Sequence, residues 1–224
     1  GKSTAASSAV AEMISADHFG AYRLVEQLPS AGDGTLYRAH DRFRGRDVAL
    51  RIFEPAAATP SWRREVWDVL RSANEPVWAT LHTHGRLNGR TFVDTAWLSQ
   101  KTLADVLVGG PMKADEAVRV LDEIAAALDR AHSVGIVHGC LVPRHVRVAP
   151  GGAILTDFAV GADAKDRDDD LIAFARLHAL CTGGSGVVPA SRESAKALVA
   201  AMRSPGPAPS PTTASPRATP PAPP

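Results

Sequence analysis

The sequence predicts an α+β fold, with a small antiparallel sheet in the first half of the chain and helices in the second half. Between residues 22 and 98, short segments of alternating polarity are separated by turn residues, a pattern typical of paired strands. From residue 111 onward, apolar positions recur every three or four residues, which indicates helices.

The composition fits one folded domain with tails. The chain has 224 residues, a net charge of +1 and 45% hydrophobic residues, enough for a core. It has no block rich in lysine or arginine, which argues against nucleic acid as the main partner. Cys140 and Cys181 are too few for a disulfide framework and fit a reducing compartment. We therefore expect a cytoplasmic location.

If the protein is attached to a membrane, the sequence suggests that the anchor lies in another part of a longer protein. No apolar run approaches the roughly eighteen residues that a membrane span needs, and no signal peptide is evident. The alternative is that the chain is the cytosolic part of a membrane protein. Residues 1–19 are rich in Ala and Ser and predict a linker, residues 20–203 the folded domain, and residues 204–224 a proline-rich tail.

Five strands and one helix are predicted in the first half. Alternation predicts strands at Tyr22–Leu28, Gly34–Ala39, Asp47–Phe53, Val77–Leu81 and Thr91–Leu98. Helical spacing predicts a helix at Ser61–Ala73, and Asn88-Gly89 is a strong hairpin signal between the last two strands.

In the second half, Pro111–His132 predicts a long helix. Its apolar face contains Ala117, Leu121, Ile124, Leu128 and Ala131. A short strand is expected at His145–Val148, a helix opening at Asp170, and a closing helix within Ser191–Arg203.

Two short motifs point to a family. Residues 138–145 read His-Gly-Cys-Leu-Val-Pro-Arg-His, and residues 157–159 read Asp-Phe-Ala. They resemble the catalytic loop H-R-D-L-K-P-x-N and the D-F-G turn of eukaryotic-like Ser/Thr protein kinases. The resemblance implies a reduced two-lobed protein-kinase-like fold, with a small antiparallel-sheet N-lobe and a shortened helical C-lobe. It is shortened because only twelve residues separate Asp157 from Asp170, which leaves no room for the activation segment.

The catalytic positions depart from the family pattern. Beside His138, Cys140 stands for the base Asp, Val142 for the phosphate-side Lys and His145 for the metal-side Asn. A thiol is a weak hydrogen-bond partner, and imidazole suits zinc or copper better than magnesium. Cys140 is either a small buried hydrophobe or a reactive nucleophile. No catalytic residue, metal or cofactor is expected.

The resemblance also identifies five residues at positions that bind the nucleotide in the family, here as a residual set that we expect to be non-functional: Gly34, Ala49, Arg51, Glu65 and Asp157. Gly34 is the only glycine at the three glycine-loop positions, so that loop is either an ordinary hairpin turn or a remnant cradle. Arg51 takes the place of the strand lysine, and its candidate partner is Glu65, in an ion pair that is either structural or orients ATP. Asp157 is either a magnesium ligand or an acceptor for nearby backbone donors.

Arg147 lies where the family has the apolar floor beneath adenine. Alternation directs Val146 and Val148 to the core and Arg147 to the opposite face. There the guanidinium would fill the space of the purine, unless it extends out along the cleft.

These departures lead us to expect a catalytically inactive pseudokinase, not an enzyme, that acts as a scaffold or regulatory module. It is similar in style to the actinobacterial pseudokinase domains of MviN-like proteins. That resemblance implies protein partners: a forkhead-associated domain that reads a phosphorylated threonine, and a Ser/Thr kinase that acts in trans. Thr212, Thr213 and Thr219 in the tail are the candidate acceptors. The alternative is a weak or atypical nucleotide-binding Ser/Thr kinase that uses Asp157, Glu65 and Arg51.

Overall fold

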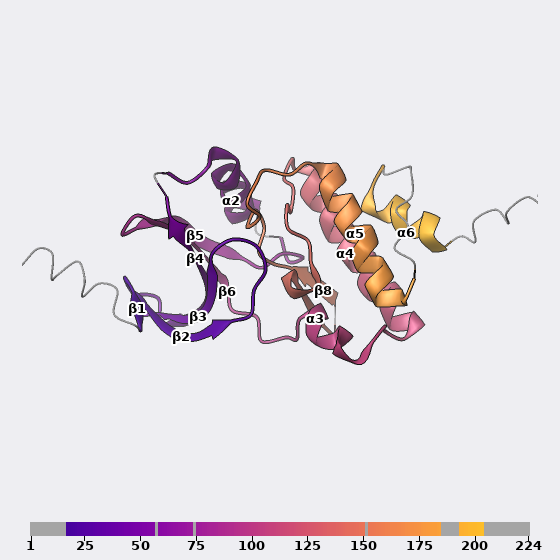
Figure 1. The fold of residues 1–224 in the computed structure, drawn as a ribbon, viewed down its shortest axis with the longest axis horizontal. Coiled ribbons are helices and arrows are strands. Elements are labelled where there is room, and N and C mark those ends of the chain that lie inside the picture. The colour runs from indigo at the N-terminus through magenta and orange to yellow at the C-terminus, as the bar shows by residue number, and fades with distance from the viewer. Residues whose placement is uncertain (1–16, 57, 74, 151, 185–192, 204–224) are drawn as a thin grey trace, which may run out of the picture.

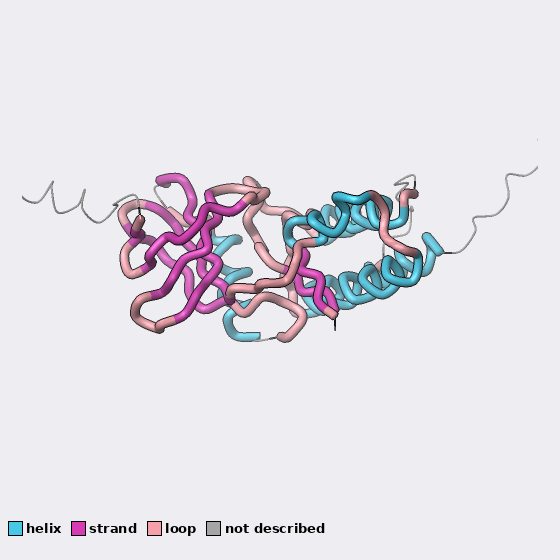
Figure 2. Tube along the Cα trace, turned by 90° about the horizontal axis from the view of Figure 1, so that it is seen from below, coloured by secondary structure: helices cyan, strands magenta, loops and turns pink. Residues whose placement is uncertain are grey.

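The computed structural model describes residues 17–56, 58–73, 75–150, 152–184 and 193–203. A sheet-rich N-lobe and a helical C-lobe lie side by side (Figure 1). Figure 2 shows the large sheet and the long helices at opposite ends of the molecule. The predicted two-lobed α+β architecture is confirmed. Residues 204–224, with the three candidate threonines, lie outside the described residues.

The N-lobe is one antiparallel sheet with the strand order β1-β2-β3-β4-β6-β5. Its strands are β1 (His18–Phe19), β2 (Tyr22–Leu28), β3 (Thr35–Asp41), β4 (Arg46–Pro55), β5 (Leu81–Leu87) and β6 (Arg90–Ala96). It has six strands instead of the five predicted, because β1 pairs with β2 from within the segment assigned to a linker. The hairpin at Asn88 and Gly89 is confirmed, with φ of 51° and 74°.

The strand predicted at Val77–Leu81 is wrong, because β5 begins at Leu81. Residues 77–80 run along the C-lobe instead: Leu155 donates to the Val77 carbonyl at 3.0 Å, and Ala79 donates to the Leu155 carbonyl at 2.8 Å. Trp78 is 3% exposed. The apolar character of this segment thus reflects burial between the lobes rather than a place in the large sheet.

Within the described parts of the chain, one α-helix belongs to the N-lobe and four belong to the C-lobe. They are α2 (Ser61–Ala73), then α3 (Leu103–Val106), α4 (Ala114–Ser133), α5 (Arg167–Thr182) and α6 (Ala195–Arg203). A two-stranded sheet, β7 (Val146–Ala149) with β8 (Gly152–Leu155), lies against α4, and two short 3₁₀ helices cover Leu107–Gly109 and Pro143–His145. All five apolar positions predicted for α4 are buried. Among the described residues, no helix has the length and apolarity needed to cross a membrane.

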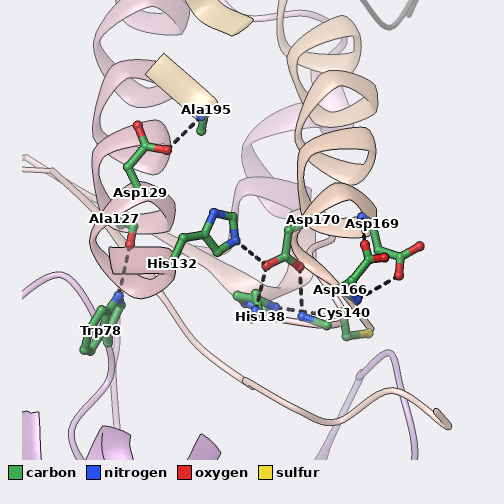
Figure 3. Close-up of polar contacts among 11 residues, drawn as sticks. Trp78, Ala127, Asp129, His132, His138, Cys140, Asp166, Asp169, Asp170 and Ala195 are labelled. Carbon is green, nitrogen blue, oxygen red and sulfur yellow. Dashed lines mark hydrogen bonds and ion pairs between the residues drawn. The ribbon is translucent and has the colours of Figure 1, made fainter. Parts of the chain in front are cut away.

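Helix α6 is held by a carboxylate from another helix. Asp129 on α4 accepts hydrogen bonds from the backbone N–H groups of Ala195, at 2.7 Å, and Lys196, at 3.1 Å. Figure 3 shows Asp129 directed at Ala195. These are first-turn donors that have no partner within a helix. At the other end of α6, Arg203 pairs with Asp122 at 2.9 Å.

We expect Asp129→Ala to lower the free energy of unfolding by about 1–2 kcal/mol, because it removes a helix cap. Asp122→Ala is the matched control on the same helix: it breaks an exposed ion pair, whose loss costs about 0–1 kcal/mol. Urea unfolding of both variants would measure the difference. Equal losses would show that Asp129 does not anchor α6.

Candidate functional site

The loop that carries the catalytic motif is anchored by Asp170, near the start of α5. Its side chain is 1% exposed and accepts hydrogen bonds from the backbone N–H groups of His138, at 2.7 Å, and Gly139, at 2.9 Å. His132 on α4 donates to the same carboxylate from Nε2 at 2.9 Å (Figure 3). One buried carboxylate therefore joins α4, the loop and α5.

His138 is fully buried, and its ring packs on Phe158 with the centroids 4.4 Å apart. Its Nδ1 accepts from the backbone N–H of Cys140 at 3.3 Å, and its carbonyl accepts from Ala159 at 2.8 Å. Burial lowers the pKa of His138 to about 4, against an opposing effect from the Asp170 charge. At neutral pH the imidazole is uncharged and acts in packing.

The other loop positions are also engaged. His145 is 1% exposed and donates from Nδ1 to the Cys140 carbonyl at 2.7 Å. The Cys140 side chain packs against the main core, and burial raises its pKa. It is therefore a protonated thiol at neutral pH, which favours the small hydrophobe over the reactive nucleophile. Val142 is half-buried.

Arg51 and Asp157 form the charged pair between the lobes. The Arg51 side chain is 1% exposed and donates to Asp157 Oδ1 from Nε, at 3.2 Å, and from Nη2, at 2.9 Å. The predicted pair of Arg51 with Glu65 is wrong, because Glu65 lies on the exposed side of α2. Asp157 accepts from side chains, Arg51 and the Thr156 hydroxyl at 2.7 Å, rather than from the backbone donors we considered.

The charge of Asp157 is stabilised by these contacts. Burial would raise the pKa of the carboxyl group, but the neighbouring His145 ring, the Arg51 guanidinium and the Thr156 hydroxyl hold it at about 2. The residue is therefore an anion throughout the physiological pH range.

Two residues of α2 that the sequence analysis did not single out bind the turn that follows Asp157. Arg63, 6% exposed, donates to the carbonyls of Ala159, at 2.9 Å, and Gly161, at 2.6 Å. Trp67 donates from Nε1 to the Phe158 carbonyl at 3.0 Å. Helix α2 therefore contacts this turn through Arg63 and Trp67 instead of through Glu65.

The segment between β2 and β3, residues 29–34, folds down onto the same turn. The backbone N–H of Asp33 donates to the Val160 carbonyl at 2.6 Å. At Gly32, with φ of 77°, a Cβ would come within 2.6 Å of that carbonyl. Gly34, with φ of 75°, would place a Cβ within 2.5 Å of the Ile52 carbonyl on β4. The segment is the connection of the β2–β3 hairpin, and Gly34 serves its packing.

The cavity beside the Arg51–Asp157 pair is small. The cavity lined by Ala49, Arg51, Thr95 and Asp157 holds about 20 Å³, room for about one water molecule. Arg147 is not among its lining residues, since the guanidinium donates from Nη1 to the Gln100 carbonyl at 3.0 Å. The Arg147 guanidinium is thus largely enclosed, and burial lowers its pKa.

The cleft beside Arg51 and Asp157 offers few ligands suited to magnesium. The donor set includes one carboxylate, Asp157, while His145 places an imidazole where an oxygen ligand is preferred.

Comparisons with known proteins support the resemblance. No protein-family model matches the chain. It is 34% identical over 155 residues to the Serine/threonine-protein kinase PknD of Mycobacterium tuberculosis, which covers 66% of this chain and 23% of that protein. It is 32% identical over 162 residues to PknE of Mycobacterium bovis, covering 70% of this chain and 29% of PknE. It is 28% identical over 154 residues to PknH of Mycobacterium bovis, covering 66% of this chain and 26% of PknH.

These relatives are Ser/Thr protein kinases, and the chain spans about a quarter of their length. Together with the two lobes they support a place in the eukaryotic-like Ser/Thr kinase family and confirm the reduced kinase-like α+β fold. They contradict the prediction that the chain is not an enzyme, because the relatives are named for an enzyme class.

The buried His138 predicts acid sensitivity of the fold. Its pKa is about 4 in the folded chain against an ordinary value of 6.5. Between these values the unfolded chain binds a proton that the folded chain does not. We therefore expect the free energy of unfolding to fall by about 1 kcal/mol per pH unit as the pH decreases through this window.

Urea unfolding at about pH 7 and about pH 5 would measure this loss in the wild type and in His138→Phe, which keeps a ring against Phe158. Burial also lowers the pKa of His145, so the variant should show a smaller pH dependence rather than none. The same pH dependence in both proteins would show that His138 is not the titrating group.

Proposed function

We propose that the chain is a weak, atypical nucleotide-binding Ser/Thr protein kinase domain. The observation that carries the proposal is the Arg51–Asp157 pair between the lobes, in which Arg51 takes the place of the family's strand lysine and Asp157 is the aspartate of the D-F-G turn. The similarity to named Ser/Thr protein kinases supports the same reaction class.

The two residues of the pair have distinct roles in this proposal. Arg51 carries a permanent positive charge and donors that match phosphate oxygens in a bidentate geometry. Asp157, with its pKa of about 2, is always available as an anionic oxygen ligand. When bound, a magnesium–nucleotide supplies the phosphoryl group and offsets its charge. To receive it, Arg51 and Asp157 must separate.

The rest of the site explains why the activity is weak. Cys140 is a protonated thiol and cannot accept a proton from a substrate hydroxyl as a carboxylate does. General-base catalysis contributes about 10²–10⁴-fold. Phosphoryl transfer depends mainly on positioning and charge stabilisation, so the loss of the base slows the reaction without removing every contribution.

The test is transfer from labelled ATP, with magnesium or manganese, to the chain itself and to a generic protein substrate. We expect a slow signal that Asp157→Asn lowers by about 10²-fold, since that variant removes one charged group from the site. Asp163→Asn changes an exposed carboxylate six residues away and should leave the signal unchanged.

A gain of function gives the sharper result. Cys140→Asp restores a carboxylate at the base position and should raise the rate by about 10²-fold or more. The proposal fails if Asp157→Asn has no effect on the signal and a folded Cys140→Asp variant brings no increase.

A further inference from the structure

Asp33 joins the segment 29–34 to both buried arginines of the cleft. Its carbonyl accepts from Arg51 Nη1 at 2.9 Å, and its carboxylate accepts from Arg63 Nη2 at 3.1 Å. Its own N–H donates to the Val160 carbonyl at 2.6 Å. Three polar contacts from one residue thus hold this segment against the turn after Asp157.

The two sides of the Asp33–Arg63 pair differ in how firmly they are held. The Arg63 side chain is 7% exposed and retains the carbonyls of Ala159 and Gly161 as acceptors, and it lies 4.4 Å above the Phe53 ring. The Asp33 side chain is 43% exposed, and its carboxylate has only Arg63 as a side-chain partner among the described residues. Water can replace that contact, so the loop side of the pair is the one that can leave.

Asp33 also affects the distribution of charge around the cleft. The carboxylate of Asp33 pairs with Arg63, which places a negative charge at the cleft, while the carbonyl of Asp33 takes an Arg51 donor that a phosphate oxygen would need. As long as the segment is down, Arg51 is covered by the Asp33 carbonyl on one side and by Asp157 on the other.

We propose that the Asp33–Arg63 pair is a closing contact, which holds segment 29–34 over the cleft and keeps Arg51 from phosphate-bearing ligands. Opening the pair lifts the segment and exposes Arg51. The claim that the pair keeps phosphate-bearing ligands from Arg51 rests on the proposed nucleotide binding. The claim that the pair holds segment 29–34 over the cleft does not.

The test compares the wild type with Asp33→Asn, which keeps the shape and removes the charge, and Asp33→Ala, which removes the acceptor. Asp163→Asn is the matched control, since it removes a nearby exposed carboxylate outside the contact. The first measurement is amide hydrogen exchange without nucleotide. We expect exchange at residues 29–34 and at Val160–Gly161 to accelerate about tenfold or more in both Asp33 variants and to stay unchanged in the control.

The second measurement is titration with ATP and, separately, adenosine. ATP affinity should increase about tenfold in both Asp33 variants, whereas adenosine affinity should change little because it has no phosphates.

The outcomes separate the two proposals. Unchanged exchange in both Asp33 variants overturns the closing contact. Faster exchange with equal, measurable ATP affinity in wild type and variants overturns its role in admitting ligands. Faster exchange with no ATP bound by any form upholds the closing contact and overturns the proposed nucleotide binding.

Discussion

A guanidinium group enclosed between the two lobes is the constraint on which the rest of this site depends. Arg51 cannot lose its charge, and burying it is costly unless its donors are paired. The Asp157 carboxylate and the Asp33 carbonyl supply the partners. Removing one partner of such a pair costs about 3–5 kcal/mol, because the remaining charge stays buried. Strand β4, the segment above it and the turn after β8 are therefore fixed relative to one another.

The turn after β8 is where contacts from both lobes meet. From the N-lobe, Arg63 and Trp67 donate to its carbonyls; from the C-lobe, the His138 carbonyl accepts from its backbone. Asp157 and Ala159 adopt φ of 59° and 57°, a region that residues other than glycine seldom occupy. Such conformations persist only where the surrounding structure imposes them. The contacts from the two lobes supply that constraint.

The sequence predicts most of the fold, because alternation and helical spacing act locally. The bounds of β2 and α2 agree with the predictions. The buried face of α2 agrees only at Leu70, although a signal was present. Helical spacing picked out Trp62, Val66, Val69 and Leu70, whereas Arg63, Trp67 and Leu70, spaced at i, i+4 and i+7, are the buried residues. This spacing was not recognised as a buried face because its first residue, Arg63, is charged.

The site was less predictable, since its contacts join distant parts of the chain. Motif matching placed Glu65 opposite Arg51, but a residue's position in a motif does not fix the direction of its side chain on a helix. The partners of Arg63, 30 and 96 residues away in sequence, come from a loop and a turn whose paths alternation does not determine. The departures from the family pattern at Cys140 and His145 could be read from the sequence directly, because they concern the identity of side chains.

The shape of the catalytic loop and its chemistry are set by different atoms. Asp170 holds the loop through the backbone N–H groups of His138 and Gly139, which every residue except proline provides. A side chain that departs from the family pattern at Gly139 or Cys140 therefore leaves this anchoring in place. Rate depends on the side chains instead, because charge and proton acceptance at the cleft come from Arg51, Asp157 and the group at position 140. A kinase-like loop can thus keep its geometry while its reactivity varies over orders of magnitude. In the weak kinase that we propose, reactivity is limited by side-chain chemistry and by the closed cleft rather than by the fold.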